Sequence, residues 1–155
     1  MTYPDFKNNF YTHHAKLLCS SYKHWAGKQL ITEYQNTKNL IEALFDAPFA
    51  LVSHGTETES VFNFGNRNAL KLFELTWEQF IQLPSRKSAD QENQEDRARL
   101  MARVNADGYA TDCKGVRISS TGKHFLIEGA TVWNVIDQNN KYHGQAAMFT
   151  QWSYL

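Results

Sequence analysis

The sequence predicts an α+β fold in which two helices precede a β-hairpin, further helices and three long strands. Three observations support this order. Apolar residues recur every three or four positions in the first third, the period shortens to β segments from Phe49, and long runs rich in β-branched and aromatic residues follow Gly108. We therefore expect a helical extension over residues 1–48 and one further domain over residues 49–155.

Two amphipathic helices are predicted ahead of the first strand. Their apolar positions are Phe6, Phe10, His14, Leu17 and Leu18 in the first helix, and Tyr34, Thr37, Ile41, Leu44 and Phe45 in the second. Gly27 ends the first helix and Pro48 ends the second. Because each helix must bury its apolar face, both should pack against the rest of the domain.

The middle of the chain predicts a hairpin and three helices. The segments FALVSHG and SVFNFGN flank the polar turn TETE, as expected of an antiparallel pair. Asn66 is the expected N-cap of the helix RNALKLFEL. Thr76 with Gln79 has the spacing of a capping box before WEQFIQL, and Ser88 with Gln91 repeats that spacing before a charge-rich, mostly exposed helix.

The stretch FLIEGATVWNVID, residues 125–137, has the composition of a strand but lacks a polar face. Alternation groups Phe125, Ile127, Thr131, Trp133 and Val135 on one side, and Leu126, Glu128, Ala130, Val132, Asn134 and Ile136 on the other. Burial is worth roughly 25 cal/mol per Å², so both sides should be covered. We expect the side with Glu128 and Asn134 to look into a cavity and the side with Trp133 to meet the N-terminal helices. A one-residue bulge at Gly129 would swap the later half of this assignment.

Composition excludes several classes of protein. The 155 residues carry 16 basic and 16 acidic side chains, so the chain lacks the positive charge that nucleic acids or anionic membranes attract. We expect neither a signal peptide nor a membrane span, which needs roughly 20 apolar residues. Cys19 and Cys113 match no metal or redox spacing. We expect a cytoplasmic protein with no nucleic acid and no membrane as partner.

Polar groups on otherwise apolar segments form the candidate ligand pocket, together with a small alanine that leaves room beside them. The candidates are Asn63, Asn66, Arg67, Arg117, Glu128, Ala130, Asn134, His143 and Gln145. The strand groups belong either to an internal hydrogen-bond network or to a ligand cavity, and both stay open. The segment FNFGNRNAL could hold an anionic group at a helix N-terminus, but we favour the simpler alternative that Gly65 and Asn66 form only the turn and the cap.

Other polar residues support no chemistry. The six histidines include no H-E-x-x-H arrangement, so we predict no metal site, and no catalytic residues are assigned. The adjacent Ser53 and His54 face opposite sides of a strand and cannot act as a dyad. Arg86, Arg97 and Arg99 lie among acids, which favours a solvated, salt-bridged helix face.

Two strands, short helices, a longer helix and three strands is the element order of a PAS domain. The strings APFALVSHGTE, FNFGNRNALKLFELTWEQFIQLPSR, GVRISSTGKHFLIEGATVWNV and YHGQAAMF closely resemble the MEKHLA family, over about residues 17–149. This PAS-related group occurs as small stand-alone bacterial proteins, the type expected here, and at the C-termini of some plant homeodomain-leucine-zipper regulators. The resemblance implies a five-stranded antiparallel sheet, with helices on its inner face and the two N-terminal helices packing on its outer face.

The known cofactors of PAS domains can be compared with this sequence. No cysteine lies between Cys19 and Cys113, and no histidine lies between His54 and His124. A covalent flavin, a His-ligated haem and a Cys-linked chromophore are therefore disfavoured. A non-covalent organic ligand, or none, remains.

We expect a sensory or regulatory module, not an enzyme, that binds a small apolar or amphipathic ligand. It should signal through its N-terminal helices or a homodimer surface to a protein partner, because we expect no DNA-binding domain, kinase or cyclase to be attached. One alternative is a small isomerase or cyclase of the cone-shaped fold, with Asp112 or Glu128 as base. Another is a structural dimerisation domain whose core is filled by its own Phe and Trp side chains.

Overall fold

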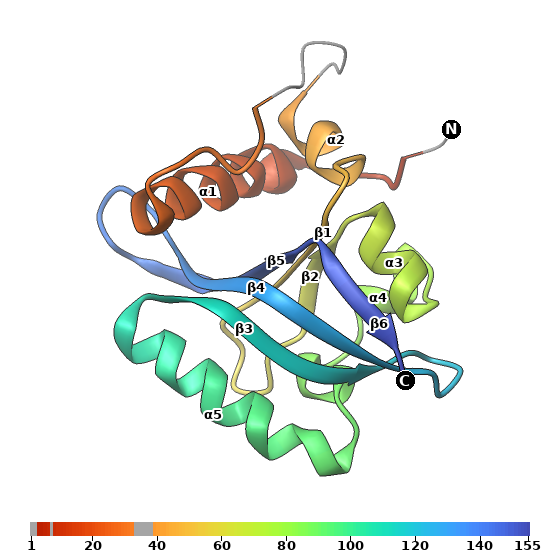
Figure 1. Cartoon of the computed structure of the whole chain (residues 1–155). Helices are drawn as coiled ribbons and strands as arrows, with labels where there is room; N and C mark the ends of the chain where they lie inside the picture. The colour runs from red at the N-terminus through yellow and green to blue at the C-terminus, as the bar shows by residue number, and fades with distance from the viewer. Residues whose placement is uncertain (1–2, 7, 33–38) are drawn as a thin grey trace.

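The computed structural model describes residues 3–6, 8–32 and 39–155, and Figure 1 shows how their helices and strands are arranged. The elements are α1 (Asn8–Ala26), α2 (Leu40–Phe45), β1 (Ala50–His54), β2 (Phe62–Gly65), α3 (Arg67–Phe73), α4 (Trp77–Phe80), a 3-10 helix (Ser85–Ser88), α5 (Gln91–Asp107), β3 (Tyr109–Ile118), β4 (His124–Ile136), β5 (Tyr142–Phe149) and β6 (Gln151–Tyr154). This order confirms the predicted α+β succession. Two apolar positions assigned to the second helix, Tyr34 and Thr37, lie outside the described residues.

The strands form one sheet in the order β2-β1-β5-β4-β3, and β6 pairs with β4 beside the end of β5. All pairs are antiparallel, including the predicted hairpin of β1 and β2. The last predicted β segment divides at Thr150, because β5 pairs with β4 over Thr131–Ile136 whereas β6 pairs with it over Phe125–Glu128. The five expected strands thus gain a short sixth.

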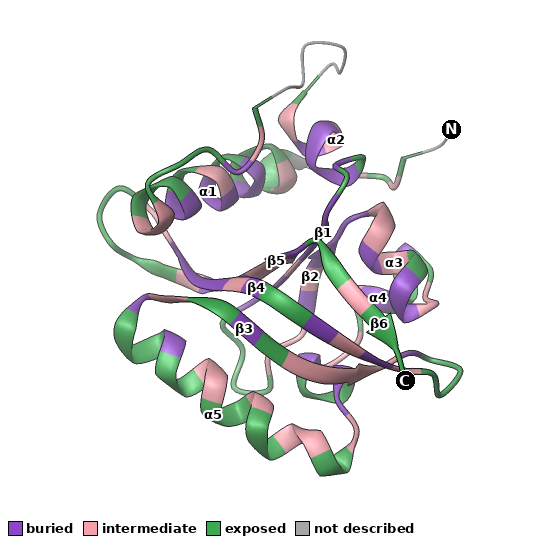
Figure 2. Ribbon diagram, viewed as in Figure 1, coloured by how far each residue is buried: buried purple, intermediate pink, exposed green. Residues whose placement is uncertain are grey.

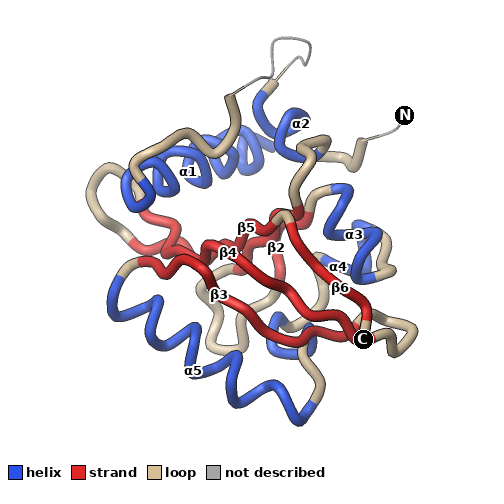
Figure 3. Tube along the Cα trace, in the orientation of Figure 1, coloured by secondary structure: helices blue, strands red, loops and turns tan. Residues whose placement is uncertain are grey.

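Helices cover both faces of the sheet, as Figures 1 and 3 show. α1 crosses the outer face, and one core there includes Leu18 and Tyr22 of α1 with Leu51, Trp133 and Val135 of the sheet. The second core lies on the inner face under α3, α4 and α5. Its large members are Phe62, Phe73, Phe80, Phe125, Ile127, Val132 and Phe149. Burial is concentrated on the sheet and on the sides of the helices that meet it, while α5 stays mostly exposed, as predicted (Figure 2).

Local capping signals locate two of three helix starts. Asn66 caps α3 by accepting from the backbone N–H of Ala69, and Thr76 with Gln79 forms the predicted capping box of α4. The third prediction was wrong. α5 begins after Asp90, because the Ser88 hydroxyl instead donates to the Ser85 carbonyl, 2.7 Å away, inside the 3-10 turn.

A bulge at Gly129 divides β4 into two halves of opposite phase. Ile127 pairs with Gly115 and Ala130 with Cys113, so three steps along β4 match two steps along β3. Gly129 absorbs the additional residue with a φ of 66°, a conformation that glycine adopts without steric cost.

The bulge decides which half of the predicted face assignment holds. After Gly129, Trp133 contacts α1 through the outer core, and Asn134 lies toward α5, as expected. Before it, the assignment was wrong, since Phe125 belongs to the inner core and Glu128 is exposed. The bulge therefore reverses our face assignment for the residues before Gly129 and leaves it unchanged for the residues after it.

A cavity under the sheet and its polar groups

A small cavity of about 60 Å³ lies between the inner face of the sheet and α5. Its apolar walls are Val52, Phe62, Phe73, Leu100, Met101, Ile127, Ala130, Val132, Ala146, Ala147 and Phe149. Its remaining lining is Ser53, His54, Ser88, Arg97, Cys113, Lys114, Gly115, Arg117 and Gln145. One water needs roughly 10–15 Å³ of such volume, so the space suits about four to six waters or a group of about that many heavy atoms.

Two arginines line this cavity, one on the helix α5 and one on the strand β3. Arg117 is half-buried on β3 and donates from Nη1 to the carbonyl of Val116, 2.9 Å away. Its guanidinium lies over Gly115, where a Cβ would come within 2.7 Å of Nη1. Arg97 is half-buried on α5, and none of the described residues makes a hydrogen bond or an ion pair with it. Glycine at position 115 therefore leaves the room that the Arg117 guanidinium occupies.

Burial makes both cations costly. It lowers the pKa of Arg117 to about 10, and burial, followed by the charge of Arg117, lowers the pKa of Arg97 to about 10. The effect of one guanidinium on the other indicates that the two positive charges repel each other in this part of the molecule. Both groups stay protonated at neutral pH, so the cavity is positively charged.

Gln145 connects the cavity to both layers of helices. Its Nε2 donates to the carbonyl of Met101 on α5 at 3.0 Å and to Oδ1 of Asn134 at 3.1 Å. Asn134 also donates from Nδ2 to the carbonyl of Asn105 on α5, and its own carbonyl accepts from Trp25 Nε1 of α1 at 2.9 Å. Asn134 of β4 thus links α5 on the inner face with α1 on the outer face.

The structure brings Arg117, Ala130 and Gln145 of the predicted set to the cavity and places Asn134 one hydrogen bond behind it. Asn63 lies instead toward the outer face, where its Oδ1 accepts from Ser53 Oγ and its carbonyl accepts from Tyr11.

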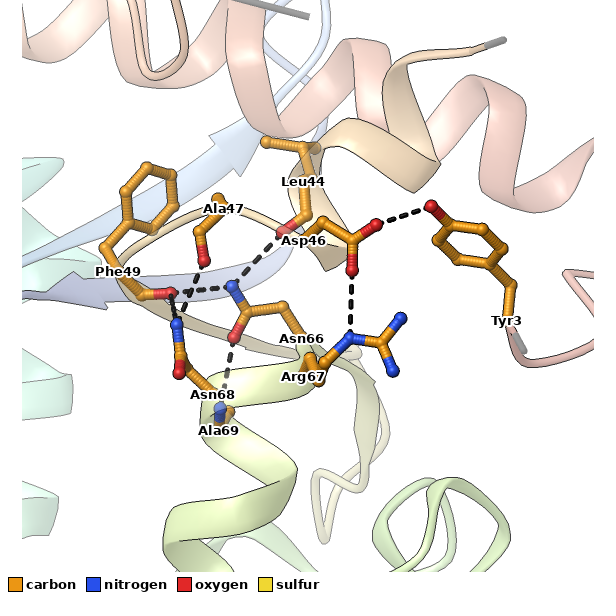
Figure 4. A network of polar contacts seen from close by, with 9 residues as sticks. All are labelled: Tyr3, Leu44, Asp46, Ala47, Phe49, Asn66, Arg67, Asn68 and Ala69. Atoms are coloured by element: carbon orange, nitrogen blue, oxygen red, sulfur yellow. Dashed lines mark hydrogen bonds and ion pairs between the residues drawn. The ribbon is translucent and has the colours of Figure 1, made fainter. Parts of the chain in front are cut away.

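Asn66 and Arg67 belong to a structural junction, drawn in Figure 4. Asn66 is fully buried, accepts from the backbone N–H of Leu51 at 3.0 Å, and donates to the carbonyls of Leu44 and Phe49. Arg67 pairs with Asp46 at 2.9 Å. These bonds tie α2, β1 and α3 together, which agrees with the simpler alternative of a turn and a cap.

Glu128 and His143 also lie away from the cavity. Glu128 points out beside the Gly129 bulge and is exposed. His143 lies with its Nε2 3.0 Å from Asp137 Oδ2. The hydrogen bond from His143, helped by the backbone N–H groups of Lys141 and Asn139, lowers the pKa of Asp137 to about 2. The pair fixes the turn between β4 and β5.

Sequence reasoning missed Arg97, which it assigned to a solvated, salt-bridged face. Arg86 and Arg99 fit that assignment, since they pair with Glu59 and Glu95 at the surface. A signal for Arg97 was present, however. It lies three, four and seven residues before Leu100, Met101 and Val104, so it continues the apolar stripe of α5 by one turn.

The described ranges contain no group of three His, Cys, Asp or Glu residues placed to hold a metal ion. Within the same ranges, no helix combines the length and apolarity needed to cross a bilayer.

Solved structures with a similar fold are PAS and light-oxygen-voltage domains. A PAS domain from Colwellia psychrerythraea superposes with a TM-score of 0.61 at 15% identity, covering 74% of this chain and 92% of that one. A light-oxygen-voltage domain studied with a flavin analogue gives a TM-score of 0.60 at 12% identity, covering 75% and 84%. The fold is therefore PAS-like, with the predicted helices on both faces of the sheet.

The residues of this chain do not fit the flavin group that such a neighbour's name implies. The cavity of about 60 Å³ is far below the roughly 300 Å³ at which cofactor-sized pockets begin. The helices that follow β2 carry no cysteine.

Curated relatives extend the comparison to sequence. Homeobox-leucine zipper protein REVOLUTA from Arabidopsis thaliana is 25% identical over 147 residues, which cover 91% of this chain and 18% of the relative. Homeobox-leucine zipper protein HOX9 from Oryza sativa is 25% identical over 142 residues, covering 91% and 17%. The chain thus spans under a fifth of the length of these proteins. The MEKHLA domain matches residues 12–154, nearly the whole sequence, and the chain belongs to the MEKHLA domain family.

Proposed function

We propose that this protein is a non-enzymatic sensory module that holds a small ligand in the cavity under its sheet and passes occupancy to α1. The observation that carries the proposal is the lining of the cavity, where apolar walls surround a few convergent polar groups. The ligand is apolar or amphipathic, bound without a covalent bond, and small unless the walls move.

The bonds around Asn134 supply a route for the signal. A ligand that displaces Gln145 also disturbs Asn134, whose carbonyl holds Trp25 of α1. Trp25 packs closely at the end of α5, because a Cβ on Gly108 would lie 2.4 Å from its ring. Occupancy would thus change how the end of α1 sits on the sheet, and either a homodimer or a cytoplasmic protein partner would sense that change.

The proposal is tested on protein purified without added small molecules, so that a ligand bound in the cell is retained. Native mass spectrometry should detect a retained mass, and a metabolite panel should raise the thermal midpoint. Binding should also shift the indole N–H resonance of Trp25, identified by its loss in Trp25→Phe. If no mass is retained and no compound shifts the midpoint, the ligand-binding function is wrong.

A purely structural dimerisation domain is the second candidate, and the small volume of the cavity favours it. Aromatic pairs fill much of the inner core, such as Phe62 stacked on Phe80 at 4.3 Å and Phe73 against Phe125 at 5.2 Å. The substitution Ala130→Val separates the two candidates, because it fills the cavity. If the protein is a sensory module, Ala130→Val should abolish its response to ligand. If it is a structural domain, neither the wild type nor Ala130→Val should respond to ligand, and sedimentation should give the same oligomeric state for both.

The enzyme alternative has little support. It required a succession of strands found in cone-shaped folds, whereas this sheet has the order β2-β1-β5-β4-β3 and PAS-like neighbours. Both candidate bases, Asp112 and Glu128, are exposed and not enclosed by apolar walls.

A further inference from the structure

The charges around the inner cavity are unbalanced. The described residues that line it include three cations, Arg97, Lys114 and Arg117, and no aspartate or glutamate. Three arginines elsewhere in the described chain, Arg67, Arg86 and Arg99, each have a carboxylate partner. The imbalance is therefore a local property of this cavity and not of the whole protein, whose net charge is zero.

Taking a cation out of water without a partner is unfavourable, because the protein interior screens and solvates it less well. Two guanidinium groups beside the same apolar cavity add mutual repulsion to that cost. An anion from outside the chain would offset both costs through charge-assisted hydrogen bonds. A guanidinium matches a carboxylate especially well, through two parallel N–H···O bonds.

We propose that the inner cavity binds a small organic carboxylate, with the anionic group between Arg97 and Arg117 and the apolar end against Met101, Ala130 and Val132. This inference rests on the proposed sensory function and names its ligand class. A volume of about 60 Å³ suits a ligand of a few heavy atoms, in the range of acetate to butyrate. The apolar walls favour a carboxylate with a short tail over phosphate, which is polar on every side.

A surface groove of about 730 Å³ between α5 and the edge strand β3 gives this ligand a way in. The groove and the cavity share Arg97, Leu100, Cys113, Lys114, Gly115 and Arg117 in their linings. The rest of the groove carries mixed charge, since Asp96, Asp112 and Glu128 line it together with Arg99 and Arg103. The excess of positive charge is therefore confined to the residues that the groove shares with the cavity.

The test is a titration of the full chain with acetate, propionate and butyrate, at an ionic strength held constant with sodium chloride. The arginine Nε–Hε resonances and the methyl group of Met101 report binding by NMR. Acetamide, propionamide and butyramide are the neutral counterparts, and inorganic phosphate is the polar anion. We expect saturable shifts with the carboxylates, a rise in the thermal midpoint of a few degrees at ten times the Kd, and no effect of the amides.

Matched variants locate the anion. Arg97→Met and Arg117→Met keep the length of the side chain and remove its charge, and each should raise the Kd for butyrate by about 10-fold to 100-fold. Arg99→Met, on the same helix but paired with Glu95 at the surface, should leave the Kd within about twofold. Circular dichroism confirms that each variant is folded before it is titrated.

Four results would overturn the inference. If the amides bind and the acids do not, the ligand is neutral, and only the sensory function survives. If phosphate binds with the same dependence on the two arginines while the carboxylates do not, the ligand class is wrong. Butyrate binding that is unchanged in both Arg97→Met and Arg117→Met places the anion elsewhere. If neither these compounds nor a metabolite panel binds, the proposed function fails together with the inference.

Discussion

The outer and inner faces of one sheet differ in how their polar groups are satisfied. On the outer face, His14 of α1 lies 2.9 Å from Ser53 Oγ, and Trp133 Nε1 donates to Ser21 Oγ at 3.0 Å. On the inner face, Arg97 has no partner among the described residues, and Arg117 donates only to a neighbouring carbonyl. Both faces are apolar, but the two arginines at the inner cavity have no carboxylate partner among the described residues.

The difference indicates that the two faces of the sheet have different roles, one in stability and one in ligand binding. α1 covers the outer face with side chains that fit the sheet closely, so that face supplies cohesion. The inner face keeps an open volume and unpaired charge, which cost stability and are useful where a ligand compensates for them. Four predictions test this difference, from the largest expected effect to the smallest.

Removal of the largest outer side chain should destabilise the fold most. Trp133 is fully buried, and its ring meets Tyr22 edge-on at a centroid distance of 5.0 Å. Trp133→Ala should lower the free energy of unfolding by about 3–5 kcal/mol, measured by urea denaturation. Trp152→Ala, on half-exposed β6, is the control and should cost about 1–2 kcal/mol. Equal losses in the free energy of unfolding would contradict the larger contribution to stability that we assign to the outer face.

The outer face should also make stability depend on pH through His14. Burial, followed by the charges of His143 and His13, lowers the pKa of His14 to about 4. The unfolded chain binds a proton near pH 6.5, so the stability that His14 contributes is complete above that pH and is lost as pH falls from 6.5 to 4. Two and a half pH units correspond to about 3 kcal/mol.

The measurement is the free energy of unfolding at pH 7.5 and pH 4.5 for the wild type and for His14→Gln, which can still hydrogen-bond to Ser53. The variant should lose much less stability between the two pH values than the wild type. His13→Gln, an exposed neighbour, serves as the control. Parallel losses in the wild type and His14→Gln would mean that His14 does not sense pH through folding.

Two valines on β4 compare the faces directly. Val135 is fully buried in the outer core, whereas Val132 lines the inner cavity. Val135→Ala should cost about 2 kcal/mol and Val132→Ala about 1 kcal/mol, because the side chain that already borders open space has fewer packing contacts to lose. Urea denaturation measures both. A larger loss at Val132 would show that the inner core is the better packed of the two.

Much of this architecture follows from periodicity, but the two faces of β4 do not. Alternation predicts one phase along the whole strand, and only Gly129 hints at an interruption. The sequence cannot show on which side of the bulge the phase changes, because that depends on the pairing with β3 and α1. Asn134 and Trp133 were therefore assigned correctly, while Glu128 and Phe125 were not.

The candidate site was less predictable than the fold, for a related reason. Polar residues on apolar strands are visible in the sequence, but whether they find partners is a matter of three-dimensional distance. Asn66 and Asn63 found partners in the chain, whereas Arg117 did not find an acid. Arg97 and Arg99 stand two residues apart on α5, a rotation of about 200° that turns one toward the cavity and the other toward solvent.

The smallest expected effect concerns the inner arginines in the absence of ligand. A half-buried charge without an acidic partner contributes little to folding, so Arg117→Met should leave the free energy of unfolding unchanged or raise it by up to about 1 kcal/mol. Arg67→Met is the contrast. Arg67 pairs with Asp46 at 2.9 Å and lies 4.8 Å from the centre of the Phe45 ring, so its loss should cost about 1 kcal/mol. Urea denaturation in a carboxylate-free chloride buffer measures both variants. If Arg117→Met is as destabilising as Arg67→Met, then Arg117 already has its stabilising partner within the chain, and the inner face is as complete as the outer one.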